Sequence, residues 1–415
     1  MKLQRCPKTY LYDTHRSQNP EETLRRVREV AKHIGVSKVV DITHLDRVGI
    51  PVVSCHRPTA AKGAVTVHTG KGATKTQAEV SALMEAVERY SAEFHGEDKG
   101  KIVKGSYSQL KSKLNLLNPE ELILPAGLKW DPDVVLRWVK GWDLLNDEEI
   151  HVPVSAVYHP YTPEDDLHLF KTTTNGLASG NTLEEAVFHG LMEVIERDAW
   201  STVEALRETC PDLHIDHCQA PLPRQLLEKF ERAGIKITLK ALPTEVGIPV
   251  VGAIADDQLS KDPALLVMGF GAHLNPEIAV IRALTEAAQS RLTQIYGARE
   301  DTKRAEFLRL LGYERVKRLN KHWFSSSGEG VDISQLPRLD TPDILDDIHV
   351  TLQKLRKAGI SKAIAVNLTR EETGISTVRI IIPGMEVYGL DSTRIGAKIQ
   401  SKLADRPSIP RAPLK

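Results

Sequence analysis

The stretch GKGATKTQAEVSALMEAVERYSAEF, from Gly70 to Phe94, decides how the rest of the sequence is interpreted. Its second half has the pattern of a helix, on which Ser81, Glu85 and Glu88 follow one another at offsets of four and three residues. At about 100° per residue, these three side chains project from one side of the helix. Taken alone, such a face opposite an apolar stripe is more typical of a solvent-exposed surface than of a site.

The same pattern returns twice further along the chain. LMEAVER at residues 83–89 is followed by LMEVIER at residues 191–197 and by the looser copy LTEAAQSR at residues 284–291. The copies are too far apart for a solenoid, whose repeats are about 20–50 residues long. They predict three equivalent units of one larger fold, each a strand, a glycine turn and a helix. The expected turns are Gly70-Lys71-Gly72, Asn175-Gly176 with Gly180-Asn181, and Gly269-Phe270-Gly271.

Each copy carries a glutamate two residues after its leucine and a glutamate or glutamine three residues further. Carboxylates and amides that converge from separate helices make an all-oxygen site, which suits the hard cation Mg²⁺. Magnesium held by acids usually accompanies phosphates. The paired side chains are Glu85 and Glu88, Glu193 and Glu196, and Glu286 and Gln289.

Two further residues near these helices allow two interpretations each. Lys71 is not part of a P-loop, because Val65 and Gly72 hold the positions that require glycine and Ser or Thr. It is either a phosphate contact before a helix start or a surface turn lysine. His189 lies four residues before Glu193 on one helical face, and is either a site residue or a structural histidine.

Composition excludes several classes of protein. Lys plus Arg and Asp plus Glu number 55 each, so no basic surface indicates a nucleic-acid partner. No signal peptide and no apolar run of about 18 residues is present, which predicts a cytosolic protein without a membrane span.

The segment CPDLHIDHC matches no standard zinc spacing, so a loop is favoured over a metal site. Its candidate ligands are Cys210, His214, His217 and Cys218.

The expected fold class is α/β (α+β) with mixed sheets and three strand, glycine turn and helix units around one site. We expect residues 1–62 to form an N-terminal helix and strands that contribute to that site, and residues 63–400 to form the catalytic domain. Residues 401–415 contain Pro407, Pro410 and Pro413, and should be an extended tail.

With these residues in view, the sequence resembles the YcaO family. The resemblance is carried by GKGATKTQAEVSALMEAVERYSAE, NGLASGNTLEEAVFHGLMEVIERDA, ALTEAAQSR and VRIIIPGMEVYG, and covers about residues 8 to 395. It implies an ATP-binding fold in which acidic helices hold Mg²⁺ against the triphosphate, and enzymes that use ATP to activate a peptide-backbone amide.

Carried over by position, the resemblance implies a set of ATP and Mg²⁺ contacts. The implied magnesium ligands are Glu85, Glu88, Glu193, Glu196 and Glu286. The implied ATP contacts are Arg16, Thr23, Lys71, Ser81, Glu85, Glu88, His189, Glu193, Glu286, Gln289 and Arg291. No residue is assigned as a general base.

The resemblance is closest to members that are associated with TfuA proteins and form thioamides, because the PxPxP ending typical of azoline-forming members is not found here. Such members in methanogenic archaea thioamidate a glycine of the methyl-coenzyme M reductase alpha subunit, which implies a sulfide donor, a possible TfuA partner and a homodimer. Two alternatives stay open: an azoline-forming cyclodehydratase, and an ATP-binding accessory protein without catalytic activity.

Overall fold

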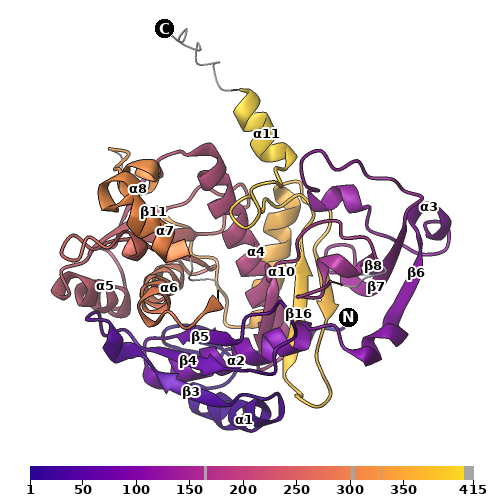
Figure 1. The fold of residues 1–415 in the computed structure, drawn as a ribbon, viewed down its shortest axis with the longest axis horizontal. Coiled ribbons are helices and arrows are strands. Elements are labelled where there is room, and N and C mark those ends of the chain that lie inside the picture. Colours follow the sequence, from indigo (N-terminus) through magenta and orange to yellow (C-terminus); the bar gives the residue numbers. More distant parts are fainter. Residues whose placement is uncertain (163–165, 301–303, 329, 406–415) are drawn as a thin grey trace.

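The strands that lead into the three repeated helices stand at the ends of three separate sheets (Figure 1). The computed structural model describes residues 1–162, 166–300, 304–328 and 330–405. The first sheet has the order β3 (Lys38–Asp41), β4 (Val52–His56) and β5 (Val67–Lys71), and all its pairs are antiparallel. A small hairpin, β1 (Tyr10–Leu11) with β2 (His15–Arg16), precedes it.

The other two sheets are larger. One has the order β6 (Ile102–Ser106), β7 (Val135–Asp143), β15 (Ile364–Asn367), β16 (Ser376–Ile381) and β9 (Leu177–Gly180), with β8 (Glu148–Pro153) paired to β7. The other has the order β13 (Met268–Ala272), β12 (Val250–Asp256), β11 (Lys236–Ala241), β10 (Asp212–His214) and β14 (Gly330–Asp332). The mixed α/β class expected from the sequence is therefore what the chain adopts.

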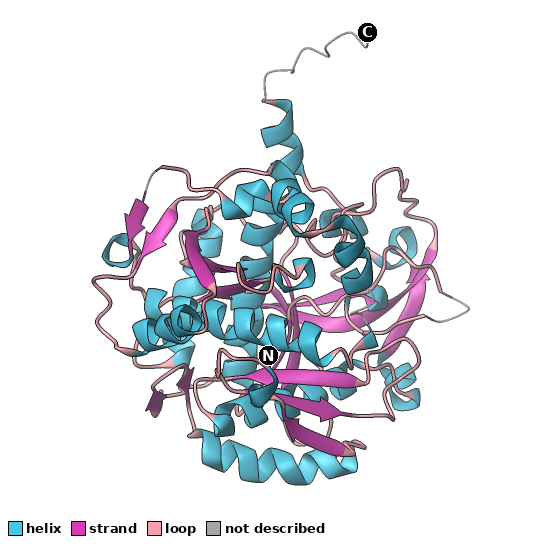
Figure 2. Ribbon diagram, turned by 60° about the vertical axis from the view of Figure 1, so that its left-hand side comes forward, coloured by secondary structure: helices cyan, strands magenta, loops and turns pink. Residues whose placement is uncertain are grey.

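Helices pack against these sheets and between them (Figure 2). The long repeated helices are α2 (Lys75–Ala92), α4 (Leu183–Leu206) and α6 (Pro276–Tyr296), each begun by a side-chain cap from Thr74, Thr182 or Asn275. The remaining helices are α1 (Pro20–His33), α3 (Tyr107–Leu110), α5 (Leu222–Arg232), α7 (Arg304–Leu311), α8 (Tyr313–Leu319), α9 (Lys321–Phe324), α10 (Ile344–Lys357) and α11 (Ala397–Ala404). Within the described ranges, no helix combines the length and the apolar character needed to cross a membrane.

The three units interlock in a ring. α2 packs on its own strand β5 and also on β9 of the second unit; α4 packs in the same way on β9 and β13, and α6 on β13 and β5. Each helix is therefore held between two sheets. The ends of the three sheets enclose a common centre, and one face of each helix is turned toward it.

The glycines expected to form turns mostly lie in the strands instead. Gly70, Gly180 and Gly271 belong to β5, β9 and β13, and only Gly176 has a positive φ, of 73°. A Cβ on Gly70 would lie 2.0 Å from the Ala82 backbone nitrogen of α2. These glycines therefore allow strand and helix backbones to approach closely, which is a recognised use of glycine in strands.

Two expected boundaries also need correction. The division at residue 62 falls inside the first sheet, because β4 and β5 pair directly from His56↔Val67 to Val52↔Lys71. The N-terminal strands therefore fold together with the first repeated unit. Residues 401–404, expected to be extended, form the last turn of α11, which projects from the body in Figures 1 and 2. Residues 406–415, with their prolines, lie outside the described residues.

Candidate functional site

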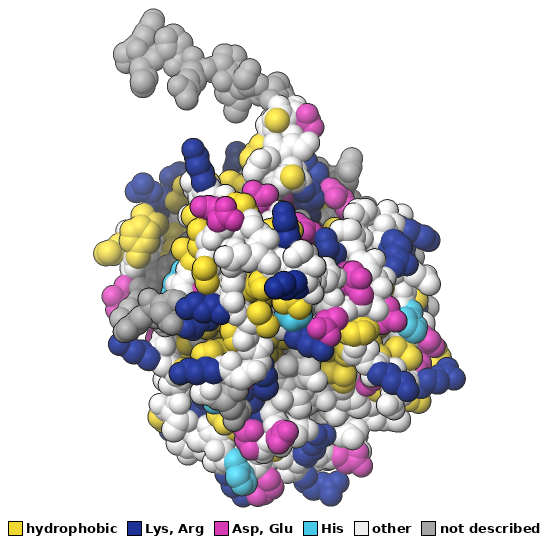
Figure 3. Space-filling view, turned by 90° about the vertical axis from the view of Figure 1, so that its right-hand side faces the viewer, with side chains coloured by type: hydrophobic (Ala, Val, Ile, Leu, Met, Phe, Trp, Pro, Cys, Tyr) yellow, Lys and Arg dark blue, Asp and Glu magenta, His cyan; other side chains and the backbone are white. Residues whose placement is uncertain are grey.

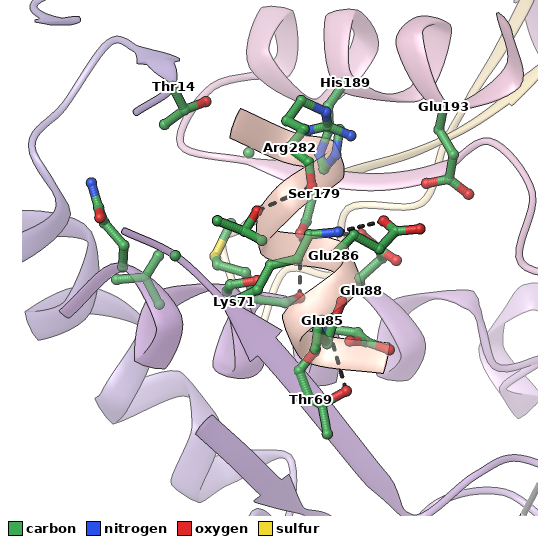
Figure 4. A pocket seen from close by; sticks show the side chains of 18 of the residues that line it. Thr14, Thr69, Lys71, Glu85, Glu88, Ser179, His189, Glu193, Arg282 and Glu286 are labelled. Atoms are coloured by element: carbon green, nitrogen blue, oxygen red, sulfur yellow. Dashed lines mark hydrogen bonds and ion pairs between the residues drawn. The ribbon is translucent and has the colours of Figure 1, made fainter. Parts of the chain in front are cut away.

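A cavity of about 610 Å³ occupies the centre of the ring. Side chains from α2, α4 and α6 line it, together with β2, β5 and the start of α1. Figure 4 shows Glu85, Glu88 and Glu286 gathered near Lys71, with Glu193 across from them on α4 and Arg282 beside His189. Helices that are distant in sequence thus bring acidic and basic side chains to one enclosed space.

The two polar positions of each repeat have different roles. The second position contacts the strand of the next unit: Glu88 is 3.5 Å from the Ser179 hydroxyl of β9, and Glu196 accepts a hydrogen bond from the Ala272 N–H of β13 at 3.1 Å. In the third unit, the Gln289 amide donates to the Thr69 carbonyl of β5. The first positions, Glu85, Glu193 and Glu286, lie at the cavity surface, where Glu286 pairs with the Lys71 side chain of β5.

The carboxylates differ in their protonation. Burial raises the pKa of Glu88 to about 8, with Glu193 and Glu85 adding to this effect and Arg89 opposing it. Burial likewise raises the pKa of Glu193. Burial acts against the ionised form of Glu286 too, but Lys71 and Arg197 outweigh it and lower the pKa of Glu286 to about 2. Burial opposes the ionised form of Glu85 as well, but Arg89 outweighs it and lowers the pKa of Glu85. The cavity therefore holds two paired carboxylates, Glu85 and Glu286, next to two carboxyl groups, Glu88 and Glu193, that lack a sufficient cation.

Four arginines that sequence reasoning did not single out also line this cavity: Arg89, Arg197, Arg282 and Arg299. The Nη1 of Arg89 and the Nε of Arg282 are buried and have no hydrogen-bond partner among the described residues. Burial, with Arg282 and Arg16 adding to it, lowers the pKa of His189 well below its ordinary value, so its imidazole is neutral. Unsatisfied guanidinium N–H groups in a cavity favour an anionic ligand.

Every implied ATP or magnesium residue lines this cavity except one. Arg291 lies outside it, and its fully buried guanidinium donates to Asp46 at 2.7 and 3.0 Å and to Asp257 at 3.2 Å. We therefore leave Arg291 out of the proposed nucleotide contacts, because its charge is already neutralised by two buried acids. The residues that do line the cavity are Arg16, Thr23, Lys71, Ser81, Glu85, Glu88, His189, Glu193, Glu196, Glu286 and Gln289.

Comparison with known proteins identifies the architecture that holds this cavity. The family model described as "YcaO cyclodehydratase, ATP- and Mg²⁺-binding" matches residues 69–386, which include all three repeated helices. The chain belongs to the YcaO family. The match ends at Glu386, a residue that is itself buried and accepts hydrogen bonds from Gly396 and Ile399.

Individual YcaO relatives extend this result over nearly the whole chain. An uncharacterised protein of Methanothermobacter thermautotrophicus is 50% identical over 92% of this chain and 98% of its own length. An uncharacterised protein in the tfuA 3′ region of Rhizobium leguminosarum bv. trifolii is 30% identical over 90% of this chain and 89% of its own length. The structure of YcaO from Methanopyrus kandleri bound with AMPPCP and Mg²⁺ has a TM-score of 0.78 and 35% identity, and the match covers 94% of this chain and 98% of that one.

The acids and arginines of the cavity suit a nucleotide that carries a metal ion, although they do not form a metal site by themselves. Among the described residues, no three His, Cys, Asp or Glu side chains form a group that could hold a metal ion alone. Mg²⁺ is usually held by one or two carboxylates and completed by phosphate oxygens and waters. Raised carboxyl pKa values beside unsatisfied guanidinium groups fit a metal-bound polyphosphate, which brings cations to the acids and anions to the arginines.

The segment CPDLHIDHC lies away from the cavity and is divided among local contacts. Asp212 to His214 form β10, Cys210 is buried, and the His217 ring contacts the Asp332 carboxylate at 2.9 Å. Burial raises the pKa of Cys210 to about 12, which keeps its thiol protonated. Asp212 also pairs with the buried Lys240 at 2.5 Å, so this segment makes packing contacts and local ion pairs.

Proposed function

We propose that this YcaO protein uses ATP and Mg²⁺ to activate a backbone amide of a peptide, and that the product is a thioamide. The observation that carries the proposal is the cavity at the centre of the ring, where acids from three helices face buried guanidinium groups. An amide carbonyl is a poor electrophile, so its oxygen needs activation before a sulfur nucleophile can replace it. Such a reaction needs a site that binds a polyphosphate and excludes water.

In the proposed reaction, sulfide adds to the amide carbon, the amide oxygen takes the γ-phosphoryl group of ATP, and phosphate then leaves with that oxygen. Amide, hydrosulfide and ATP thus give thioamide, ADP and phosphate. The protein's part is to position the reactants and to offset charge.

Glu85, Glu88, Glu193 and Glu286 are the proposed magnesium ligands. Glu196 is better suited to holding α4 against β13 than to binding the metal. It is almost fully buried and already accepts a hydrogen bond from the Ala272 N–H. Lys71 now pairs with Glu286, and we propose that it turns to a phosphate when the ligand binds.

The remaining proposed ATP contacts lie around these acids. Arg282 and Arg89 supply unsatisfied N–H groups for phosphate oxygens, and Arg16 lies at the same cavity. Thr23 donates to Asn181 at 2.9 Å and so links the start of α1 to that of α4. Ser81, His189 and Gln289 complete the proposed set.

Thioamide formation is favoured over azoline formation by the similarity to a protein encoded in a tfuA 3′ region. On this basis we propose a TfuA-type partner, a sulfide donor and, as the substrate, a glycine of the methyl-coenzyme M reductase alpha subunit. The similar proteins from Methanothermobacter and Methanopyrus are consistent with that substrate. A homodimer and a cytoplasmic location are part of the same proposal.

Mass spectrometry of the reacted peptide distinguishes the alternatives. Exchange of oxygen for sulfur adds about 16 Da, azoline formation removes about 18 Da, and an accessory protein leaves the mass unchanged. Glu85→Ala and Glu193→Ala should each abolish ATP consumption without unfolding the protein. Normal turnover by both variants would contradict the proposed site.

A further inference from the structure

A second cavity, of about 470 Å³, lies on the other side of the fold between β7 and β15. Its floor is apolar and buried, with Val139, Tyr158, Ala365 and Leu368 each at most 5% exposed. Figure 3 faces the side of the molecule where β6 and β7 lie, and shows basic side chains spread among apolar ones. None of the residues implied for ATP or magnesium lines this cavity.

The cavity lies where one sheet splits. β8 pairs with one edge of β7 from Trp138 to Asp143. The other edge of β7 pairs with β6 as far as Val139 and with β15 only from Trp142 onward. In continued register Asn367 would lie opposite Lys140, but no such pair is formed in the described sheet. β15 and β6 thus diverge from the same edge and leave an opening between them.

Main-chain groups point into this opening. Opposed residues of antiparallel strands exchange either both hydrogen bonds or neither, and the pattern alternates along each strand. The Leu368 N–H donates to the Thr377 carbonyl of the β16 segment at 2.8 Å. The neighbouring Asn367 therefore turns its N–H and C=O away from β16, toward the cavity. In the described sheet, the pairing of β15 with β7 ends at Ala365↔Trp142 and does not reach Asn367.

The charge around the opening is mainly positive. Lys101, Lys140 and Arg370 line it against a single acid, Asp98, which is bound by Arg370 at 2.7 Å. Lys101 pairs with Asp98 at 3.3 Å and Lys140 with Glu149 at 2.5 Å, but the two lysine side chains are 61% and 63% exposed. Exposed ion pairs of this kind contribute little stability, so either lysine can exchange its partner for an acidic ligand. A free strand edge over an apolar floor, with lysines at its rim, matches an extended chain whose side chains alternate between apolar and acidic.

We propose that this opening binds an extended peptide segment that alternates apolar and acidic residues and adds as a strand along β15. Its main chain pairs with Asn367, its apolar side chains enter the cavity, and its acidic side chains reach Lys101 and Lys140. Identifying the segment as part of the modified substrate rests on the proposed function; the binding itself does not. The site would hold a substrate at a point remote from the reacting amide.

The test uses a fluorescent, capped octapeptide that alternates valine and aspartate, and a control peptide of the same length that alternates serine and lysine. Fluorescence anisotropy with the full-length protein, without ATP, should show saturable binding of the first peptide only. Lys101→Glu with Lys140→Glu should weaken this binding by about tenfold or more. Lys104→Glu, on an exposed β6 position outside the cavity, is the matched control and should change it less than about twofold.

Hydrogen exchange gives a second measurement, because peptide binding should slow exchange of the Asn367 amide. Asn367→Pro removes that N–H and should weaken binding; if this variant does not fold, the double lysine variant and the exchange data still decide. The proposal is overturned by equal binding of both peptides, by equal effects of Lys104→Glu and the lysine pair, or by variants that change only the oligomeric state. Glu85→Ala should bind the peptide normally, so loss of catalysis and loss of docking are distinguishable.

Discussion

Replacement of Glu88 by glutamine separates the structural role of this carboxyl from its proposed metal-binding role. Its pKa, raised by burial from 4.5 to about 8, means that the folded protein without ligand holds the Glu88 proton at neutral pH. Glutamine resembles this protonated form in shape and charge. The substitution should therefore leave the unliganded fold intact, while it removes a carboxylate that Mg²⁺ could bind.

The pH dependence of stability gives the magnitude. The unfolded chain releases the Glu88 proton above its ordinary pKa of 4.5, whereas the folded chain keeps it until about pH 8. The stability that Glu88 contributes is complete below 4.5 and is lost as pH rises toward 8. Each pH unit in this window lowers the free energy of unfolding by about 1.4 kcal/mol. Relative to Glu88→Gln, the unsubstituted protein should thus lose about 2 kcal/mol between pH 6 and 7.5.

Urea unfolding at several pH values, without Mg²⁺ or nucleotide, measures this difference. Glu29→Gln on α1 is the control, because its side chain is 70% exposed and the substitution should not alter the pH slope. With Mg²⁺ and ATP present, Glu88→Gln should lower ATP turnover by about a hundredfold. If the variant and the unsubstituted protein show the same pH slope, Glu88 is ionised in the free protein and the argument that burial raises its pKa fails.

Three other predictions address packing, charge and the metal. Gly70→Ala should cost about 3 kcal/mol or more in unfolding free energy, because its Cβ would meet the α2 backbone; soluble, equally stable protein would contradict this. Arg291→Met leaves Asp46 and Asp257 without their buried cation, and calorimetry should show a loss of about 3–5 kcal/mol. ATP should raise the melting temperature only when Mg²⁺ is present, and a full shift in EDTA would oppose the proposed carboxylate site.

The repeated motif made much of the site predictable from sequence. A glutamate followed three residues later by a second polar residue places both on one helical face, and three such helices implied one centre. What the spacing could not show is that the second residue of each pair faces the next strand. That depends on contacts such as Glu196 with Ala272, between residues 76 positions apart in the sequence.

The misplacement of Arg291 has a simple geometric origin. On an ideal helix it lies about 140° from Glu286, on the opposite side of α6. Arg282, one turn before Glu286, lies only about 40° from it and does reach the cavity. Helical spacing alone therefore favours Arg282 over Arg291 as the arginine that shares the cavity with Glu286.

Other features depend on pairing that spacing does not reveal. Glycine next to a helix start was interpreted as a turn, but Gly180 lies in a strand that α4 contacts closely. The opening beside β15 was not predictable either. It depends on β7 pairing with β6 and with β15, strands more than two hundred residues apart in the chain.

The differences among the three repeats follow from the partners that each second position meets. Glu196 faces a backbone N–H of β13, so it must accept, and a carboxylate does so well. Gln289 faces the Thr69 carbonyl of β5, so it must donate, which a carboxylate cannot do and an amide can. Glu88 faces a hydroxyl, which either donates or accepts, and its raised pKa leaves it free to change protonation. The ring is thus built from three similar units that differ in the hydrogen bond between each helix and the next strand. Because Glu196 is used in such a bond, the acids that stay available are not arranged with threefold symmetry, which suits a ligand that has none.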